Sequence, residues 1–257
     1  MQNVEPRPGP RAEGPVVPYR HLAGWTIATS VVLGAVAFML ALLTESVIAD
    51  ARNQSDVRDQ IFVARSDLAG VHTRWVTLTR GAVLFLVVAA VLWLVCQYQA
   101  HANLRALGTS RIPPWLAIAM WLIPGLNVLL AWVGLGDLWL GSEPGQRDAK
   151  AGPRAFPPIL ALWWGSFSAA VVLTAVALLR TPSGARADDL IPRDRLLVAA
   201  CLTGIAAAIL GIMLLVKIEG RIDVKEDAAG HPSWRAWSDG RPEPGTPLPP
   251  RETRDMA

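Results

Sequence analysis

Four long apolar runs constrain the fold of this chain more than any other feature of its sequence. They cover about residues 22–43, 81–98, 159–179 and 196–216. A helix needs roughly 20 predominantly apolar residues to cross the hydrocarbon core of a bilayer, and each run approaches or exceeds that length. The sequence therefore predicts an all-α, polytopic membrane helix bundle with about four transmembrane helices.

The composition agrees with a membrane protein and argues against several other classes. Hydrophobic residues make up 52% of the chain and charged residues 18%, whereas a soluble domain carries about 25% charged residues. The small positive net charge of +3 favours contact with an anionic lipid leaflet over nucleic acid. Cys96 and Cys201 lie inside predicted spans, which favours small buried hydrophobes over a disulfide framework or a zinc site.

The membrane domain is expected at residues 21–220, between two disordered tails. Residues 1–20 form a Pro/Arg-rich N-tail, and residues 221–257 form a Pro-rich C-tail. The first apolar run is too long for a secretory h-region and is expected to be retained. Residues 45–79 are polar with apolar side chains at helical spacing, which predicts an extramembrane helix or helical hairpin that extends the first two spans.

A fifth apolar stretch, residues 115–140, is interrupted by Pro124 and Gly125. Proline removes a helical hydrogen bond, and a broken backbone in lipid must be covered by protein or reach water. We expect a re-entrant or interfacial helical segment here. With four crossings, the Lys and Arg distribution places both termini in the cytoplasm of a bacterial inner membrane. A five-crossing arrangement with an external N-terminus gives the same charge bias.

Polar and aromatic residues around this broken segment form the candidate site. Polar groups at membrane depth suggest function, and Gln97 and His101 share a helix face because they are four residues apart. Asn127 and Asp137 would approach them if the segment folds back. Such a set could bind a small polar or anionic ligand, or it could satisfy the broken backbone and reach interfacial water. The candidates are Gln97, His101, Asn103, Arg105, Trp121, Pro124, Asn127, Asp137 and Trp139.

A series of motifs runs through the same region in a fixed order. They are Trp93, Asn103–Gly108, Pro114-Trp115, Trp121 with Ile123-Pro124 and Asn127, Asp137-Leu138-Trp139, and Trp163-Trp164. Over about residues 80–220 the chain thereby resembles a bacterial multi-pass membrane family, the domain of unknown function 4328. It departs at Leu129–Trp132, where that family tends to carry a Trp-Arg-Pro-Tyr-like run. The resemblance implies a multi-pass membrane protein and implies no reaction.

The motif search favours a protein without catalytic machinery. The sequence has no Gly-rich phosphate loop, nucleophile elbow or metal-ligand spacing, so no enzyme activity, cofactor or metal is expected. We expect a structural or interaction protein of the bacterial cell envelope, with the lipid bilayer and a membrane-protein partner or a second copy as its partners. The alternatives are a small-solute transporter or channel component that uses the Pro124 segment, and a membrane-embedded enzyme acting on lipid.

Overall fold

The computed structural model describes residues 21–59, 65–123, 127–144, 157–180 and 187–228, and these residues form helices without any strand. Four of the helices are long and apolar enough to cross a membrane, which confirms the predicted all-α polytopic bundle. The helices are α1 (Ala23–Arg58), α2 (Arg65–Ala106), α3 (Pro114–Leu122), α4 (Asn127–Ser142), α5 (Pro158–Leu179) and α6 (Ala187–Ala228).

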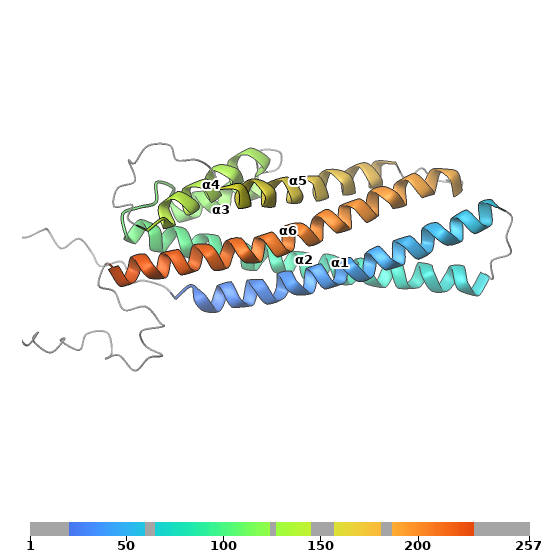
Figure 1. Cartoon of the computed structure of the whole chain (residues 1–257), viewed down its shortest axis with the longest axis horizontal. Helices are drawn as coiled ribbons and strands as arrows, with labels where there is room; N and C mark the ends of the chain where they lie inside the picture. Colours follow the sequence, from blue (N-terminus) through green and yellow to red (C-terminus); the bar gives the residue numbers. More distant parts are fainter. Residues whose placement is uncertain (1–20, 60–64, 124–126, 145–156, 181–186, 229–257) are drawn as a thin grey trace, which may run out of the picture.

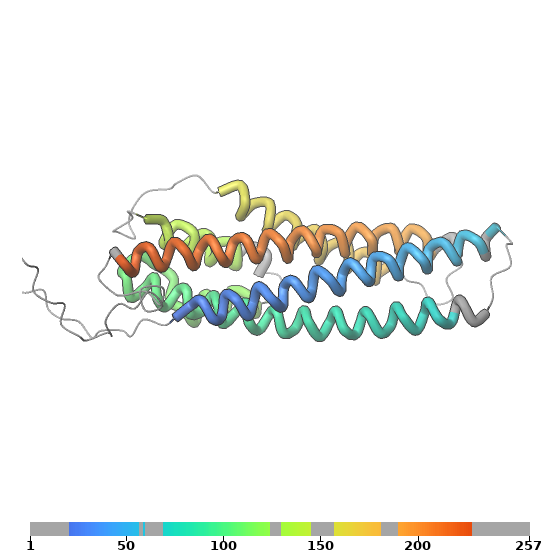
Figure 2. The backbone as a smooth tube through the Cα atoms, turned by 60° about the horizontal axis from the view of Figure 1, so that its bottom comes forward, coloured from blue at the N-terminus to red at the C-terminus, as the bar shows by residue number. Residues whose placement is uncertain are grey.

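The four long helices lie side by side along the long axis of the molecule (Figures 1 and 2). α1 packs between α2 and α6, and α6 packs against α5. Within the described ranges, no Cα atom of α2 lies within 8 Å of a Cα atom of α5. The short helices α3 and α4 lie at one end of the bundle, where they connect α2 to α5 and α6 (Figure 1).

Small residues allow the long helices to approach closely. A Cβ atom on Gly204 of α6 would lie 2.9 Å from Leu40 Cδ1 of α1, and one on Gly81 of α2 would lie 2.6 Å from Met39 Cε. Membrane helices rely on such contacts because lipid tails give no hydrophobic drive toward association. The glycines therefore position α1 against both of its neighbours.

Three of the helices are much longer than a bilayer requires. α1 has 36 residues, and α2 and α6 have 42 each, so their lengths are about 54 and 63 Å against a hydrocarbon core of about 30 Å. The polar connection at residues 45–79 takes the hairpin form: α1 continues to Arg58, and α2 begins at Arg65. We call residues 44–58, 65–80 and 187–195 the helical arm.

The C-terminal end of α6 departs from the sequence-based expectation. The tail was expected to begin at residue 221, but the helix continues to Ala228. The helix continues because Ile218 and Ile222, which are 3% and 0% exposed, lie four residues apart and keep one face of the helix buried. Residues 1–20 and 229–257, which were expected to be disordered, lie outside the described residues.

Candidate functional site

The motif Asn103–Gly108 ends helix α2. Gly108 has a φ of +72°. The backbone N–H of Thr109 donates to the Leu104 carbonyl at 2.9 Å, and that of Gly108 donates to the Arg105 carbonyl at 3.0 Å. This pair of bonds around a left-handed glycine is the Schellman motif, which satisfies the last carbonyls of a helix. The motif thus turns the chain sharply into the connection formed by residues 109–112.

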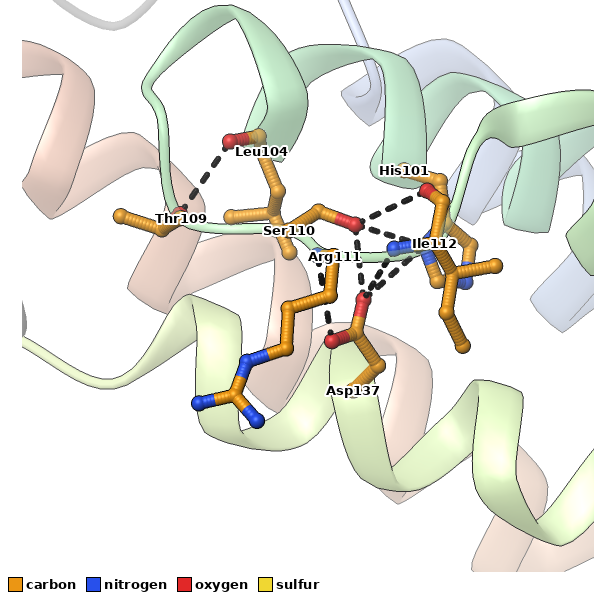
Figure 3. A network of polar contacts seen from close by, with 7 residues as sticks. All are labelled: His101, Leu104, Thr109, Ser110, Arg111, Ile112 and Asp137. Carbon is orange, nitrogen blue, oxygen red and sulfur yellow. Dashed lines mark hydrogen bonds and ion pairs between the residues drawn. The ribbon is translucent and has the colours of Figure 1, made fainter. Parts of the chain in front are cut away.

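Asp137 of α4 holds this connection in place (Figure 3). Ser110 Oγ donates to Asp137 Oδ2 at 2.7 Å. The backbone N–H groups of Arg111 and Ile112 lie 3.3 and 3.4 Å from Oδ1 and Oδ2, respectively. Hydrogen bonds to a carboxylate are stronger than those between neutral groups. One side chain of α4 therefore anchors a stretch of backbone some 25 residues earlier in the chain.

His101 extends the network into the bundle. Its side chain is fully buried, and its Nδ1 atom lies 3.2 Å from Ser110 Oγ and 3.6 Å from Asp137 Oδ2. Among the described residues, Nε2 has no hydrogen-bond partner. A Ser-His-Asp catalytic triad places the serine and the aspartate on opposite ring nitrogens, but here both face Nδ1. The arrangement suits a structural network better than acyl transfer.

The C-terminal half of α4 is also held from α6. Lys225 Nζ donates to the Gly141 carbonyl in the last turn of α4, where a cation complements the exposed carbonyls of a helix end. The guanidinium carbon of Arg221 lies 4.0 Å from the ring centroid of Trp139, and Lys217 Nζ lies 5.5 Å from it. α4 is therefore fastened to the end of α2 on one side and to α6 on another.

An aromatic cluster surrounds the far end of α3. Trp93 of α2 stacks on Trp163 of α5, with ring centroids 5.1 Å apart and planes inclined by 14°. Trp121, near the end of α3, meets both rings edge-on at 6.1 and 6.2 Å. It also contacts the rings of Trp164 and Phe167. Each such pair contributes about 0.5–1.5 kcal/mol beyond burial of its area.

These contacts define the path of the broken segment. α3 leads from the 109–112 connection to the aromatic cluster between α2 and α5, and α4 returns so that Asp137 contacts Ser110. α3 and α4 have 9 and 16 residues, which gives about 14 and 24 Å, less than the roughly 30 Å needed to cross. The pair therefore forms a helical hairpin, which follows the path expected of a re-entrant segment.

A family model described as "Domain of unknown function (DUF4328)" matches residues 56–220, which is more than half of the chain. The chain belongs to this family. The match begins at the end of α1 and covers α2, the α3–α4 hairpin, α5 and most of α6. Searches of the curated proteins and of the solved structures returned no match.

The structure of this DUF4328 protein brings together part of the candidate set. His101 and Asp137 share one network, and Trp139 follows Asp137 on α4 with 7% of its surface exposed. Asn103 is buried beside that network, whereas Arg105 is exposed. Gln97 is buried one turn before His101 on α2, and together with Thr26 it lines a cavity of about 10 Å³. Trp121 belongs to the aromatic cluster instead.

Two candidates have no described side-chain environment. Pro124 lies outside the described residues, and Asn127 begins α4 although its side chain is not described. The sequence interpretation also missed residues that complete the site. Ser110 carried a signal, because it stands between Gly108 and Pro113 in a polar linker. The residues Lys217, Arg221 and Lys225 repeat at intervals of four on α6, which places them on one helix face.

Proposed function

We propose that this protein is a structural or interaction protein of the bacterial cell envelope. The observation that supports the proposal is that His101, Asp137 and Lys225 all contact other groups of this chain. Asp137 accepts hydrogen bonds from one hydroxyl and two backbone N–H groups, and Lys225 donates to a backbone carbonyl. Groups arranged in this way fix the α3–α4 hairpin, and the hairpin in turn gives the membrane bundle a rigid end.

The helical arm supports an interaction role because it extends a folded surface beyond the apolar runs. Arg74 of α2 pairs with Glu45 of α1 at 3.0 Å, with both side chains at least half exposed. Such a surface pair contributes only about 0–1 kcal/mol. Val47, 1% exposed, and Asp194, also 1% exposed, indicate that the arm has an interior of its own. We propose that its exposed polar surface binds a protein partner.

The charge distribution supports an orientation for this arrangement. The beginning of α1 and the end of α6 lie at the end of the bundle that carries the α3–α4 hairpin (Figure 1). Lys and Arg are more numerous on that side of the four apolar runs, and positive residues favour the cytoplasm. We therefore propose that both termini and the hairpin face the cytoplasm of the inner membrane, with the arm on the opposite side.

Site-specific photo-cross-linking in living cells tests the interaction role. A photoreactive residue replaces Arg52 of α1 or His72 of α2, both exposed in the arm, and the matched control replaces Val171 of α5, which is 52% exposed in an apolar span. We expect discrete protein adducts from the two arm positions and none from the control. The absence of adducts from the arm, or the same adducts from Val171, would contradict the proposal.

One observation favours transport as a second candidate function. α3 ends at Leu122, next to Trp121 of the aromatic cluster, and Ile123 is extended with φ −86° and ψ 107°. Interrupted helices near the middle of the membrane form binding sites in transporters. Flux of a defined solute into proteoliposomes, lost in Asp137→Asn but retained in Asp59→Asn at the end of the arm, would favour this function over the interaction role.

A further inference from the structure

Two cations of α6 share one aromatic ring. Lys217 Nζ and the guanidinium carbon of Arg221 lie 5.5 and 4.0 Å from the ring centroid of Trp139. A cation over an indole face is attracted by the ring quadrupole. Because both side chains are held by the same ring, two positive charges are kept close together on one face of α6.

Neither of these two cations forms an ion pair with a carboxylate within the described parts of the chain. Arg74 pairs with Glu45, and Arg193 pairs with Asp194 and Asp50. By contrast, the contacts of Lys217 and Arg221 are those with Trp139. The Arg221 side chain is half-buried, and its buried Nη1 atom has no hydrogen-bond partner in the described structure.

The position of the pair along the helix matches the depth of lipid headgroups. The apolar run of α6 ends at Val216, immediately before Lys217. Ile218 and Thr26 of α1 line the same small cavity, and the neighbouring Trp25 is 41% exposed. Exposed tryptophans are enriched at the boundary between the acyl chains and the headgroups. Lys217 is exposed and Arg221 is half-buried at this level.

We propose that Lys217 and Arg221 bind the phosphate of an anionic phospholipid headgroup, with Trp139 as the platform that holds both cations. The guanidinium offers two parallel N–H donors to phosphate oxygens, and the ammonium adds a compact charge. Lys225, four residues further along α6, is excluded from this role because it donates to the Gly141 carbonyl of α4. The site would therefore join a lipid molecule to the α4–α6 contact.

Native mass spectrometry of the full-length protein tests the site. The protein is extracted from mixed phosphatidylcholine and phosphatidylglycerol bilayers, and the retained phosphatidylglycerol is measured for wild type, Lys217→Gln, Arg221→Gln and the double variant. Arg105→Gln is the matched control, because Arg105 is exposed at the last turn of α2 and contacts no aromatic ring in the described structure. A variant that keeps both positive charges, Lys217→Arg with Arg221→Lys, shows whether lipid retention depends on the charges or on the shapes of the two side chains.

We expect wild type to retain phosphatidylglycerol over phosphatidylcholine, with retention about fivefold lower for each charge removed. The charge-preserving variant and Arg105→Gln are expected to retain the lipid. Lys217→Gln alters an exposed side chain, so its result does not depend on the fold. Equal retention by wild type and the double variant, or equal loss in Arg105→Gln, overturns the proposal. Stabilisation of the protein by inorganic phosphate in pure phosphatidylcholine, to the same extent as by phosphatidylglycerol, overturns the assignment to a lipid.

Discussion

Replacing Asp137 by alanine should release the connection between α2 and α3. The variant loses the 2.7 Å bond from Ser110 Oγ and two longer bonds from the N–H groups of Arg111 and Ile112. A hydrogen bond to a charged group contributes about 1.5–3 kcal/mol, and a weaker one about 0.5–1.5 kcal/mol. Part of the lost hydrogen-bond free energy is recovered because the freed N–H groups reach water. We expect a loss of about 2–4 kcal/mol in the stability of this region.

Hydrogen exchange of the peptide that contains residues 109–112 measures this effect directly. A local loss of about 2–4 kcal/mol corresponds to an exchange rate about 30- to 700-fold higher at the affected amides, since about 1.4 kcal/mol is a factor of ten. The helical amides of α1 and α5 should exchange as in wild type. Asp59→Asn, an exposed change at the end of the arm, serves as the control for charge.

A milder substitution, Ser110→Ala, measures the contribution of the Ser110 hydroxyl separately from that of the Asp137 carboxylate. Ser110→Ala removes the contacts of Ser110 Oγ with Asp137, with His101 and with the Ile112 carbonyl. It should cost about half as much as Asp137→Ala, because the two backbone N–H bonds to Asp137 remain. If Asp137→Ala leaves the exchange of residues 109–112 unchanged, Asp137 does not hold this connection and our interpretation of the network is wrong.

Three further substitutions test the packing around the hairpin. Gly108→Ala should lower the free energy of unfolding by about 1–2 kcal/mol, because a φ of +72° disfavours any residue with a Cβ atom; an unchanged melting temperature would contradict this. Gly141→Ala should cost about 1–3 kcal/mol, since its Cβ atom would lie 3.1 Å from Leu104 Cδ1 and 3.2 Å from the Thr109 carbonyl oxygen; Gly165→Ala, which meets nothing within 4 Å, is the control. Trp163→Leu should weaken the hairpin more than Trp115→Leu, because Trp163 stacks on Trp93 and Trp115 is 66% exposed; proteolytic resistance of the hairpin ranks the two.

The apolar runs predicted the membrane helices because length and hydropathy decide whether a segment can lie in lipid. The proline break likewise predicted that residues 115–140 form two helices, α3 and α4, instead of one, because proline removes a helical hydrogen bond. The end of α6 was not predicted correctly. The prediction ended the membrane domain at residue 220 because the sequence becomes polar after Lys217. It gave too little weight to the spacing of Ile218 and Ile222, through which the buried face of the helix continues.

The partners within the site depend on how the chain returns through space. Asp137 and Ser110 are 27 residues apart, and nothing in their separate motifs pairs them. The same holds for Trp139 with Lys217 and Arg221, which come from helices separated by α5. The sequence could nominate Asp137 and Trp139 because polar and aromatic residues are conspicuous in an apolar stretch. It could not show that one holds a backbone connection and the other holds two cations.

Side-specific cysteine labelling measures whether α3 and α4 form a hairpin that returns to its own side of the membrane. Single cysteines replace Arg111, before α3, and Pro144, after α4, in a background with Cys96→Ala and Cys201→Ala; a third replaces Arg52 in the arm. With a membrane-impermeant maleimide, we expect Arg111→Cys and Pro144→Cys to label from the same side and Arg52→Cys from the other. Labelling of Arg111→Cys and Pro144→Cys from opposite sides would contradict it.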